Sequence, residues 1–188
     1  MRRKVWSSLA ICVALAGGCG GTKWSAGSTP TTNPKRLPRG WAVYTDPSGI
    51  TLQHPTAWTT QSGRLSPLLV FIDRAADSGG FRRNINVLVQ PVSPGFTLAE
   101  YLRVRRQELS SSGGTLEEDR AATLGRLAGH EVIWRLSRSG KTIRFLSVWT
   151  LRRGKAYLLT YASDDANFSA PLGDVRRLIA SVRLPKTP

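Results

Sequence analysis

The two histidines, His54 and His130, are the side chains best suited to acid–base chemistry, because an unperturbed imidazole titrates near neutral pH. His54 shares a face with Ile50 and Leu52 in an alternating stretch, so we interpret it as a packed structural histidine. His130 lies at the start of a predicted strand, and we expect a turn or edge position there. Two histidines would need carboxylates to complete a zinc site. We therefore predict no metal site, no cofactor and no catalytic residue, although a hydrolase using either histidine is an alternative.

Two short motifs resemble ligand sites without matching one. Residues 139–142, Ser-Gly-Lys-Thr, resemble the end of a phosphate-binding P-loop. That motif requires a glycine where the chain has Arg135, and a helix where the pattern predicts a strand, so we interpret the residues as a hairpin turn. Glu117, Glu118 and Asp119 form the acidic run of the sequence and could bind a cation. Because Arg120 follows directly, we expect a solvated loop or edge instead.

The charge of the chain is strongly positive, with 27 Lys and Arg against 12 Asp and Glu and a formal net charge of +15. A basic protein is attracted to an anionic membrane or polymer, and this attraction is screened over about 8 Å at physiological salt. Arginines in predicted loops and on outward faces would form a docking surface for an acidic partner if they converge, and ordinary solvated surface if they do not. These candidates are Arg82, Arg83, Arg103, Arg106, Arg152, Arg153, Arg176 and Arg177.

Periodicity and turn signals predict the elements that must position these residues. A helix begins at Thr97, where Thr97 and Glu100 match a capping box. Tight hairpin turns are expected at Ser139-Gly140 and Arg153-Gly154. The predicted strands cover 41–45, 50–54, 68–73, 85–89, 115–124, 130–138, 142–152 and 156–163, and a helix over 169–180 precedes a final edge strand over 181–184.

The strand from Ile143 to Leu151 indicates how the domain is layered. Phe145 and Trp149 lie on one face of this strand and Leu146 and Val148 on the other, so both of its faces are apolar. Such a strand lies inside a sheet that is covered on both sides. The order of strands, helix, strand meander and helix favours an α+β fold with a largely antiparallel β-sheet flanked by helices, an α/β/α sandwich.

The N-terminal residues have the layout of an export signal. Arg2, Arg3 and Lys4 precede an apolar run of about a dozen residues, whereas a transmembrane helix needs about 20. The run ends in Leu-Ala-Gly-Gly before Cys19, which resembles the lipobox of bacterial lipoproteins. This resemblance implies that residues 1–18 are a lipoprotein signal peptide and that Cys19 carries acyl chains such as palmitate. The alternative is an ordinary secretory signal cut near residue 16.

The region after Cys19 divides into a linker and a domain. Residues 19–39 are rich in Gly, Ser, Thr and Pro and nearly lack apolar side chains, so we predict a lipidated flexible tether. Residues 40–185 contain the predicted helices and strands and form the folded domain. An exported, membrane-anchored chain rarely meets nucleic acid, so we expect no nucleic-acid partner despite the high charge.

A family resemblance is carried by residues 49–58. The sequence Gly-Ile-Thr-Leu-Gln-His-Pro over 49–55, followed by Trp58, resembles the opening of PsbP-like domains. The strand near Asn84, the helix from Thr97 and the C-terminal helix follow in the same order, and the resemblance covers about residues 40–184. In layout the chain resembles the LpqN-type lipoproteins of actinobacteria. The resemblance implies an antiparallel sheet flanked by helices and a domain that binds protein partners, with no shared catalytic motif.

These observations define one expected function and one alternative besides the hydrolase. We expect an extracytoplasmic lipoprotein, held on the cell membrane by its lipid anchor, whose PsbP-like domain is a non-enzymatic binding or adaptor module. Its partner would be a protein or an anionic component of the cell envelope. The alternative is a binder of anionic envelope polymer or lipid that acts through an arginine-rich surface.

Overall fold

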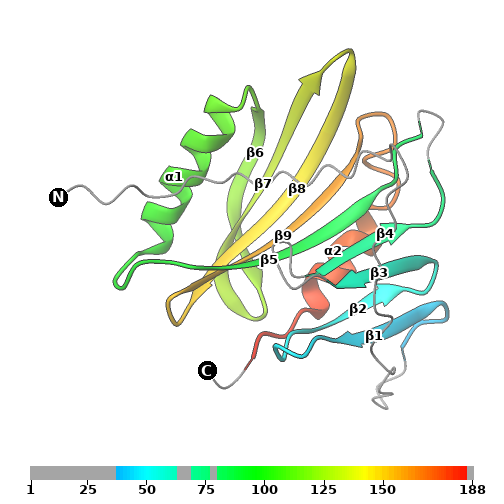
Figure 1. The fold of residues 1–188 in the computed structure, drawn as a ribbon, viewed down its shortest axis with the longest axis horizontal. Coiled ribbons are helices and arrows are strands. Elements are labelled where there is room, and N and C mark those ends of the chain that lie inside the picture. Colours follow the sequence, from blue (N-terminus) through cyan, green and yellow to red (C-terminus); the bar gives the residue numbers. More distant parts are fainter. Residues whose placement is uncertain (1–36, 63–68, 77–79, 186–188) are drawn as a thin grey trace.

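The fold was analysed in a computed structural model that describes residues 37–62, 69–76 and 80–185. The predicted signal peptide, Cys19 and most of the predicted tether lie outside these residues. The elements are, in chain order, β1 (Trp41–Thr45), β2 (Thr51–Pro55), β3 (Trp58–Ser62), β4 (Leu69–Asp73), β5 (Asn84–Pro91), α1 (Leu98–Ser111), β6 (Thr115–Leu124), β7 (Leu127–Arg138), β8 (Lys141–Arg152), β9 (Lys155–Asp164) and α2 (Leu172–Ser181) (Figure 1). Within the described ranges, no helix is both long and apolar enough to cross a membrane.

The main sheet is antiparallel throughout, with strands in the order β3-β4-β5-β9-β8-β7-β6, while β1 and β2 pair separately. Tight turns join β6 to β7, β7 to β8 and β8 to β9. Residues in these turns have positive φ, at Gly125-Arg126, Ser139-Gly140 and Arg153-Gly154, as two-residue hairpin loops require. The last two turns confirm the prediction, and the first was missed. The predicted α+β class with a largely antiparallel sheet is confirmed.

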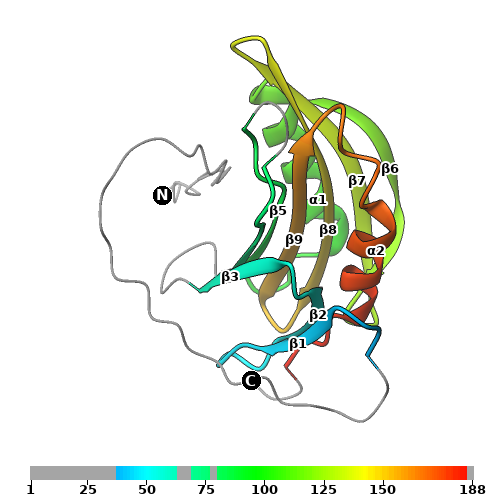
Figure 2. The ribbon, with the colours of Figure 1, turned by 90° about the vertical axis from the view of Figure 1, so that its right-hand side faces the viewer.

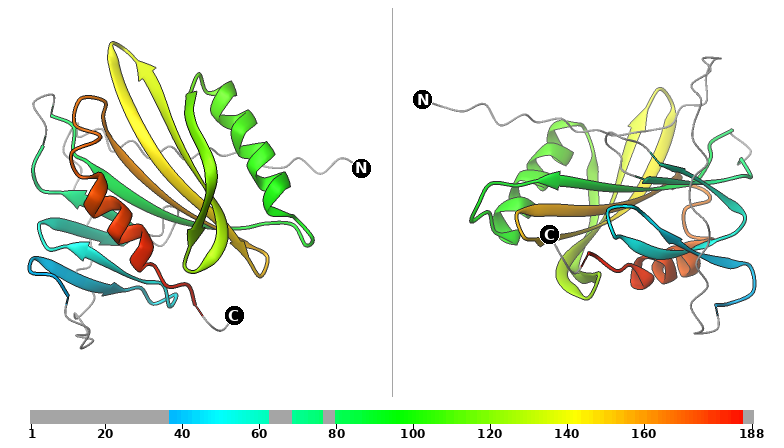
Figure 3. Two further views of the ribbon diagram at one scale, coloured as in Figure 1. Left: turned by 180° about the vertical axis from the view of Figure 1, so that it is seen from behind. Right: turned by 60° about the horizontal axis from the view of Figure 1, so that its bottom comes forward.

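The sheet has an apolar cluster on each face, because its interior strands are apolar on both. On one face Leu146 and Val148 pack in a cluster with Leu178 of α2, and on the other Phe145 and Trp149 pack in a cluster with Tyr101 of α1. This confirms that β8 is an interior strand covered on both sides. Figure 3 shows α2 lying across the strands on the face that is hidden in Figure 1.

Helix α1 begins as its sequence predicts. Thr97 is the N-cap, its hydroxyl accepts from the Glu100 N–H, and the Glu100 carboxylate accepts in return from the Thr97 N–H. A reciprocal cap of this kind satisfies backbone donors that the first turn leaves unpaired. Helix α2 starts at Leu172, three residues later than predicted, and it has no side-chain cap.

Near the ends of the domain, one sequence prediction is wrong and one strand was missed. Residues 181–184 form no strand; Arg183 makes a single bridge to Thr51, and the Ser181 hydroxyl accepts a hydrogen bond from the Gln53 N–H. The strand β3 was not predicted, because its sequence Trp-Thr-Thr-Gln-Ser alternates too weakly to indicate a buried face. β3 nevertheless forms one edge of the main sheet by pairing with β4.

Candidate functional site

His54 is a packing residue, as predicted. It is buried on β2, its ring centroid lies 4.9 Å from that of Phe71, and its Nδ1 lies 2.9 Å from the Pro55 carbonyl oxygen. Burial lowers the pKa of His54, against a smaller opposing effect of the hydrogen bond to Pro55. His54 is therefore neutral at pH 7 and contributes to the core on the α2 face.

His130 does not occupy the turn or edge position that the sequence suggested. It is the fourth residue of β7, and it is half-buried because β7 lies inside the sheet, paired with β6 on one side and with β8 on the other. Its Nε2 contacts the Asp119 carboxylate and lies 3.4 Å from Nη2 of Arg106. The prediction of a turn or edge is wrong because β7 begins three residues earlier, at Leu127.

Arg106, Asp119 and His130 form a group that we name the Asp119 cluster, on the α1 face of the sheet. Nε of Arg106 donates to the Asp119 carboxylate over 2.6 Å, which ties α1 to β6. Burial alone raises the pKa of Asp119, but the hydrogen bonds from Arg106 and His130 bring it below its ordinary value. A carboxylate can orient a histidine for base catalysis. Here, however, the third group is a guanidinium and not a nucleophilic hydroxyl or thiol.

Arg120, Glu131 and Arg176 form the Glu131 cluster on the opposite face of the same two strands. Glu131 is 6% exposed, although it is a carboxylate. Arg120 lies directly across the ladder and donates from Nε over 3.1 Å, and Arg176 of α2 donates from Nη1 over 2.9 Å and 3.0 Å. Sequence reasoning missed this cluster, although a glutamate ahead of the buried run Val-Ile-Trp was a usable signal. The cluster ties α2 to β6 and β7.

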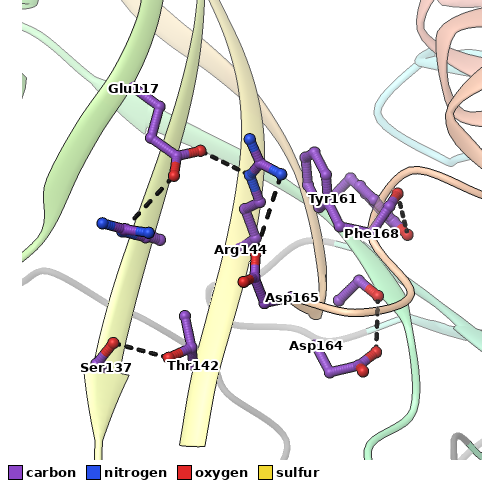
Figure 4. Close-up of polar contacts among 10 residues, drawn as sticks. Glu117, Ser137, Thr142, Arg144, Tyr161, Asp164, Asp165 and Phe168 are labelled. Carbon is purple, nitrogen blue, oxygen red and sulfur yellow. Dashed lines mark hydrogen bonds and ion pairs between the residues drawn. The ribbon is translucent and has the colours of Figure 1, made fainter.

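A third polar group is built around Glu117, at a β-bulge in β6. Its carboxylate accepts from Nε of Arg144 over 2.6 Å and lies 3.6 Å from Nε of Arg135 (Figure 4). Arg135 and Arg144 are direct cross-strand neighbours, so Glu117 offsets the repulsion between them. Arg144 also lies 4.9 Å from the ring centroid of Phe168. The acidic run is on an edge strand, as expected, but Glu117 and Asp119 are paired with arginines and not only solvated.

The eight predicted arginines are not brought together. Arg82 and Arg83 precede β5, and Arg152 and Arg153 lie at the β8–β9 turn; these positions are at opposite ends of β5 and β9, about 25 Å apart along the strands. The helices carrying the other four lie on opposite faces of the sheet. The known partners are Asp73 for Arg83, Asp119 for Arg106, Glu131 for Arg176 and the ring of Trp41 for Arg177.

The remaining candidates for ligand chemistry can now be placed. Ser139 and Gly140 form the β7–β8 turn and Lys141 and Thr142 start β8, so the P-loop-like residues are a hairpin, as interpreted. In the part of the chain that the structure describes, no three His, Cys, Asp or Glu residues are grouped so that they could hold a metal ion. The polar groups described above are built from arginine–carboxylate ion pairs.

The fold defines a class. No family model matches the sequence, and no curated protein matches it. Solved structures do match. Cyanobacterial PsbP (CyanoP) from Synechocystis superposes with a TM-score of 0.60 at 15% identity, over 90% of this chain and 99% of that one. The described domain therefore has the PsbP-like fold, as the resemblance in residues 49–58 implied.

Two further structures share this fold. LpqN, involved in cell envelope biogenesis of Mycobacterium tuberculosis, matches with a TM-score of 0.58 at 18% identity, over 77% of this chain and 91% of LpqN. A Pseudomonas aeruginosa protein of unknown function matches with a TM-score of 0.57 at 13% identity, over 79% and 99%. At these identities the similarity shows the fold and assigns no activity.

Proposed function

We propose that the protein is an extracytoplasmic lipoprotein whose PsbP-like domain is a non-enzymatic binding or adaptor module. One observation carries this proposal: a lipobox-like segment ending at Cys19 is followed by a Gly/Ser/Thr/Pro-rich linker and then by a PsbP-like domain. Acylation with more than one chain gives stable membrane attachment without a spanning helix. The tether then holds the domain outside the membrane, where it can meet a partner.

The use of the titratable groups supports a binding role over catalysis. His54 is packed against Phe71, and His130 is paired with Asp119. Glu131 and Glu117 are both paired with arginines. These are contacts that hold helices and strands in place, and a catalytic base would instead need access to a reacting proton.

The structural neighbours support the location. LpqN is involved in cell envelope biogenesis in Mycobacterium tuberculosis. A lipid-anchored domain of the same fold is suited to work at the envelope, and we place the function of this chain there. The partner in this proposal is a protein or an anionic component of the envelope.

The experiment that tests this function compares the native protein with Cys19→Ser. We expect the native form in the membrane fraction with a diacylglyceryl mass on Cys19, and the variant to lose both. Cys12→Ser is the matched control, because Cys12 lies in the predicted leader and its loss leaves the membrane attachment unchanged. A native protein that is unlipidated and released from the membrane would refute the proposal. If the native protein is anchored as expected, crosslinking from it identifies the partner.

A further inference from the structure

The two outer strands of the main sheet differ in how well their free edges are protected. β6 contains a bulge and the consecutive charged residues 117–120, and natural sheets use both features to prevent pairing with another chain. β3, at the other end, has the sequence Trp-Thr-Thr-Gln-Ser, which contains no proline and no charged residue, and its register with β4 is regular. β3 is therefore the edge strand that is open to further pairing, over a short length of five residues.

The backbone of Thr60, in the middle of β3, points away from the sheet. The Asp73 N–H donates over 2.9 Å to a carbonyl on the β5 side of β4. Backbone groups alternate between the two sides of an antiparallel strand, so those of residues 70 and 72 face β3. Thr59 and Gln61 pair with these two residues, so Thr60 between them directs its N–H and C=O outward. Within the described ranges, these outward groups have no hydrogen-bond partner.

The β1–β2 hairpin lies next to β3 but does not pair with it. Residues 56–57 join β2 to β3, yet the two strands belong to different sheets. The ring of His54 on β2 packs on Phe71, which belongs to the apolar cluster on the α2 face, and the other end of β2 is bridged to Arg183 beyond α2. Figure 2 shows β1 and β2 below β3, on the side of α2. The hairpin therefore packs on the α2 face and does not extend the ladder of β3.

The charge of the chain favours a second copy of itself at this edge. With a formal net charge of +15, two copies repel each other wherever their basic side chains meet. β3 contributes no charge, and Asp73, opposite Trp58, is already paired with Arg83. Two copies can therefore approach along β3 without bringing like charges together. Thr60 is the midpoint of β3, so an antiparallel arrangement about a twofold axis places it opposite Thr60 of the second copy, and Thr–Thr cross-strand pairs are favourable.

We propose that β3 is a dimerisation edge, through which two copies of this chain join their main sheets in an antiparallel arrangement with Thr60 at the twofold axis. The outward N–H and C=O groups of the two Thr60 residues pair with each other, and the exposed Gln61 of one copy lies opposite Thr59 of the other. Because the arrangement uses the open edge of both copies and β6 is protected, association stops at two. The inference goes beyond the proposed function and does not depend on the lipid anchor.

Sedimentation equilibrium of the chain from residue 19 onward, with Cys19→Ser, tests the dimer. This protein keeps every described residue and lacks the site of acylation, so it needs no detergent. We expect a monomer–dimer equilibrium between about 1 and 300 µM, which tightens as salt screens the repulsion between two basic molecules. Gln61→Lys places like charges beside the twofold axis and should weaken the dimer about five- to tenfold. Gln107→Lys adds the same charge to an exposed residue of α1 and should change it less than about twofold.

Thr60→Cys in the same protein reports the register directly. Without Cys12 and Cys19 the protein has no other cysteine, so oxidation can link two copies only through the introduced thiol. Directly opposed residues of an antiparallel ladder have Cα atoms about 4.5–5.5 Å apart, which is within the range of a disulfide. We expect a disulfide-linked dimer after mild oxidation. Gln107→Cys, the matched control, should remain monomeric under the same conditions.

Three outcomes would overturn the inference. A monomer at every concentration would exclude the dimer and leave the edge to a strand of a different protein. A dimer that Gln61→Lys leaves unchanged would have its interface elsewhere. Association that weakens with salt would rest on ion pairs and not on an uncharged edge. Circular dichroism checks that each variant is folded, and if Thr60→Cys is not, the change at the exposed Gln61 still decides the question.

Discussion

The two arginine–carboxylate clusters on β6 and β7 use the same side-chain chemistry in different surroundings. In the Glu131 cluster the carboxylate is 8% exposed at its side chain and is held by two guanidinium groups. In the Asp119 cluster the carboxylate is 21% exposed and its Arg106 partner is 44% exposed. A buried carboxylate is costly without its partners, whereas an exposed pair contributes little. From this comparison we expect the Glu131 cluster to contribute more to the free energy of unfolding than the Asp119 cluster does.

The apolar packing around the two clusters also favours the Glu131 cluster, because the α2 face is better satisfied than the α1 face. Helix α2 buries Val175, Leu178 and Ile179 in a cluster that also includes β2. Below α1, the indole N–H of the buried Trp149 has no hydrogen-bond partner among the described residues. An unsatisfied buried donor costs about 1–3 kcal/mol. The α1 face is therefore expected to open more readily than the α2 face.

The largest effect is expected for Glu131→Ala. It removes the carboxylate from between Arg120 and Arg176, and the free energy of unfolding should fall by about 2–3 kcal/mol. The loss stays below that of a fully buried pair because these two arginines are 52% and 40% exposed and regain water. Urea denaturation of the native protein and of Glu131→Ala measures this fall in the free energy of unfolding. A loss equal to that of Asp119→Ala would break the distinction between the clusters.

The second effect is a dependence of stability on pH through His54. Burial holds its folded pKa below the unfolded value, so the unfolded state binds more protons between the two. Stability is full above about pH 6.5 and falls as the pH drops from there towards the folded pKa, by at most about 1.4 kcal/mol per pH unit. Denaturation at pH 7.5 and 5.5 checks this: His54→Phe should flatten the difference in unfolding free energy between the two pH values. A difference that survives His54→Phe would contradict the assignment.

The third prediction separates the contribution of Arg176 from that of Arg120 within the Glu131 cluster. Arg176→Gln leaves Glu131 with Arg120, so the loss in unfolding free energy should be about 1 kcal/mol. Hydrogen exchange should show the loss concentrated in α2, because Arg176 is the ion-pair link of that helix to the sheet. Arg177→Gln, the adjacent arginine over Trp41, serves as the control and should change less. An equal effect of the two substitutions would show that the ion pair adds nothing.

The smallest effect is expected for Asp119→Asn, about 0.5 kcal/mol at pH 7. The lowered pKa of Asp119 means that its charge stabilises the fold above the ordinary Asp pKa, and this stabilisation is lost as the pH falls through the lowered value. The native and variant proteins should therefore converge in stability once the pH falls below this lowered pKa. Faster hydrogen exchange in α1 but not in α2 would sharpen the comparison. A loss as large as that of Glu131→Ala would refute it.

Local signals in the sequence were sufficient for most of the fold. Thr97 and Glu100 lie three residues apart and meet within one helical turn, so their cap was readable. The positive φ at Ser139-Gly140 follows from the turn type that a two-residue loop requires. The missed turn at Gly125-Arg126 has the same chemistry in reverse order, with the glycine first.

The polar clusters were not readable, because their partners are brought together only by the tertiary fold. Arg176 and Glu131 are separated by 45 residues. Arg144 carries a local signal, since it is a charged residue next to a strand segment with two apolar faces, but nothing in the sequence identifies Glu117 as its partner. The predicted arginine surface depended on convergence, and convergence is a property of strand order, which the sequence left open.

The bulge in β6 also bears on how neighbouring copies of the protein behave. β6 is the outermost strand at one end of the sheet, so its outer backbone groups can pair with another chain. The register shift between Leu116 and Glu118, together with Glu118 on an exposed stretch, interrupts the regular ladder that such pairing needs. Neighbouring molecules built this way are therefore expected to resist joining their sheets edge to edge along β6.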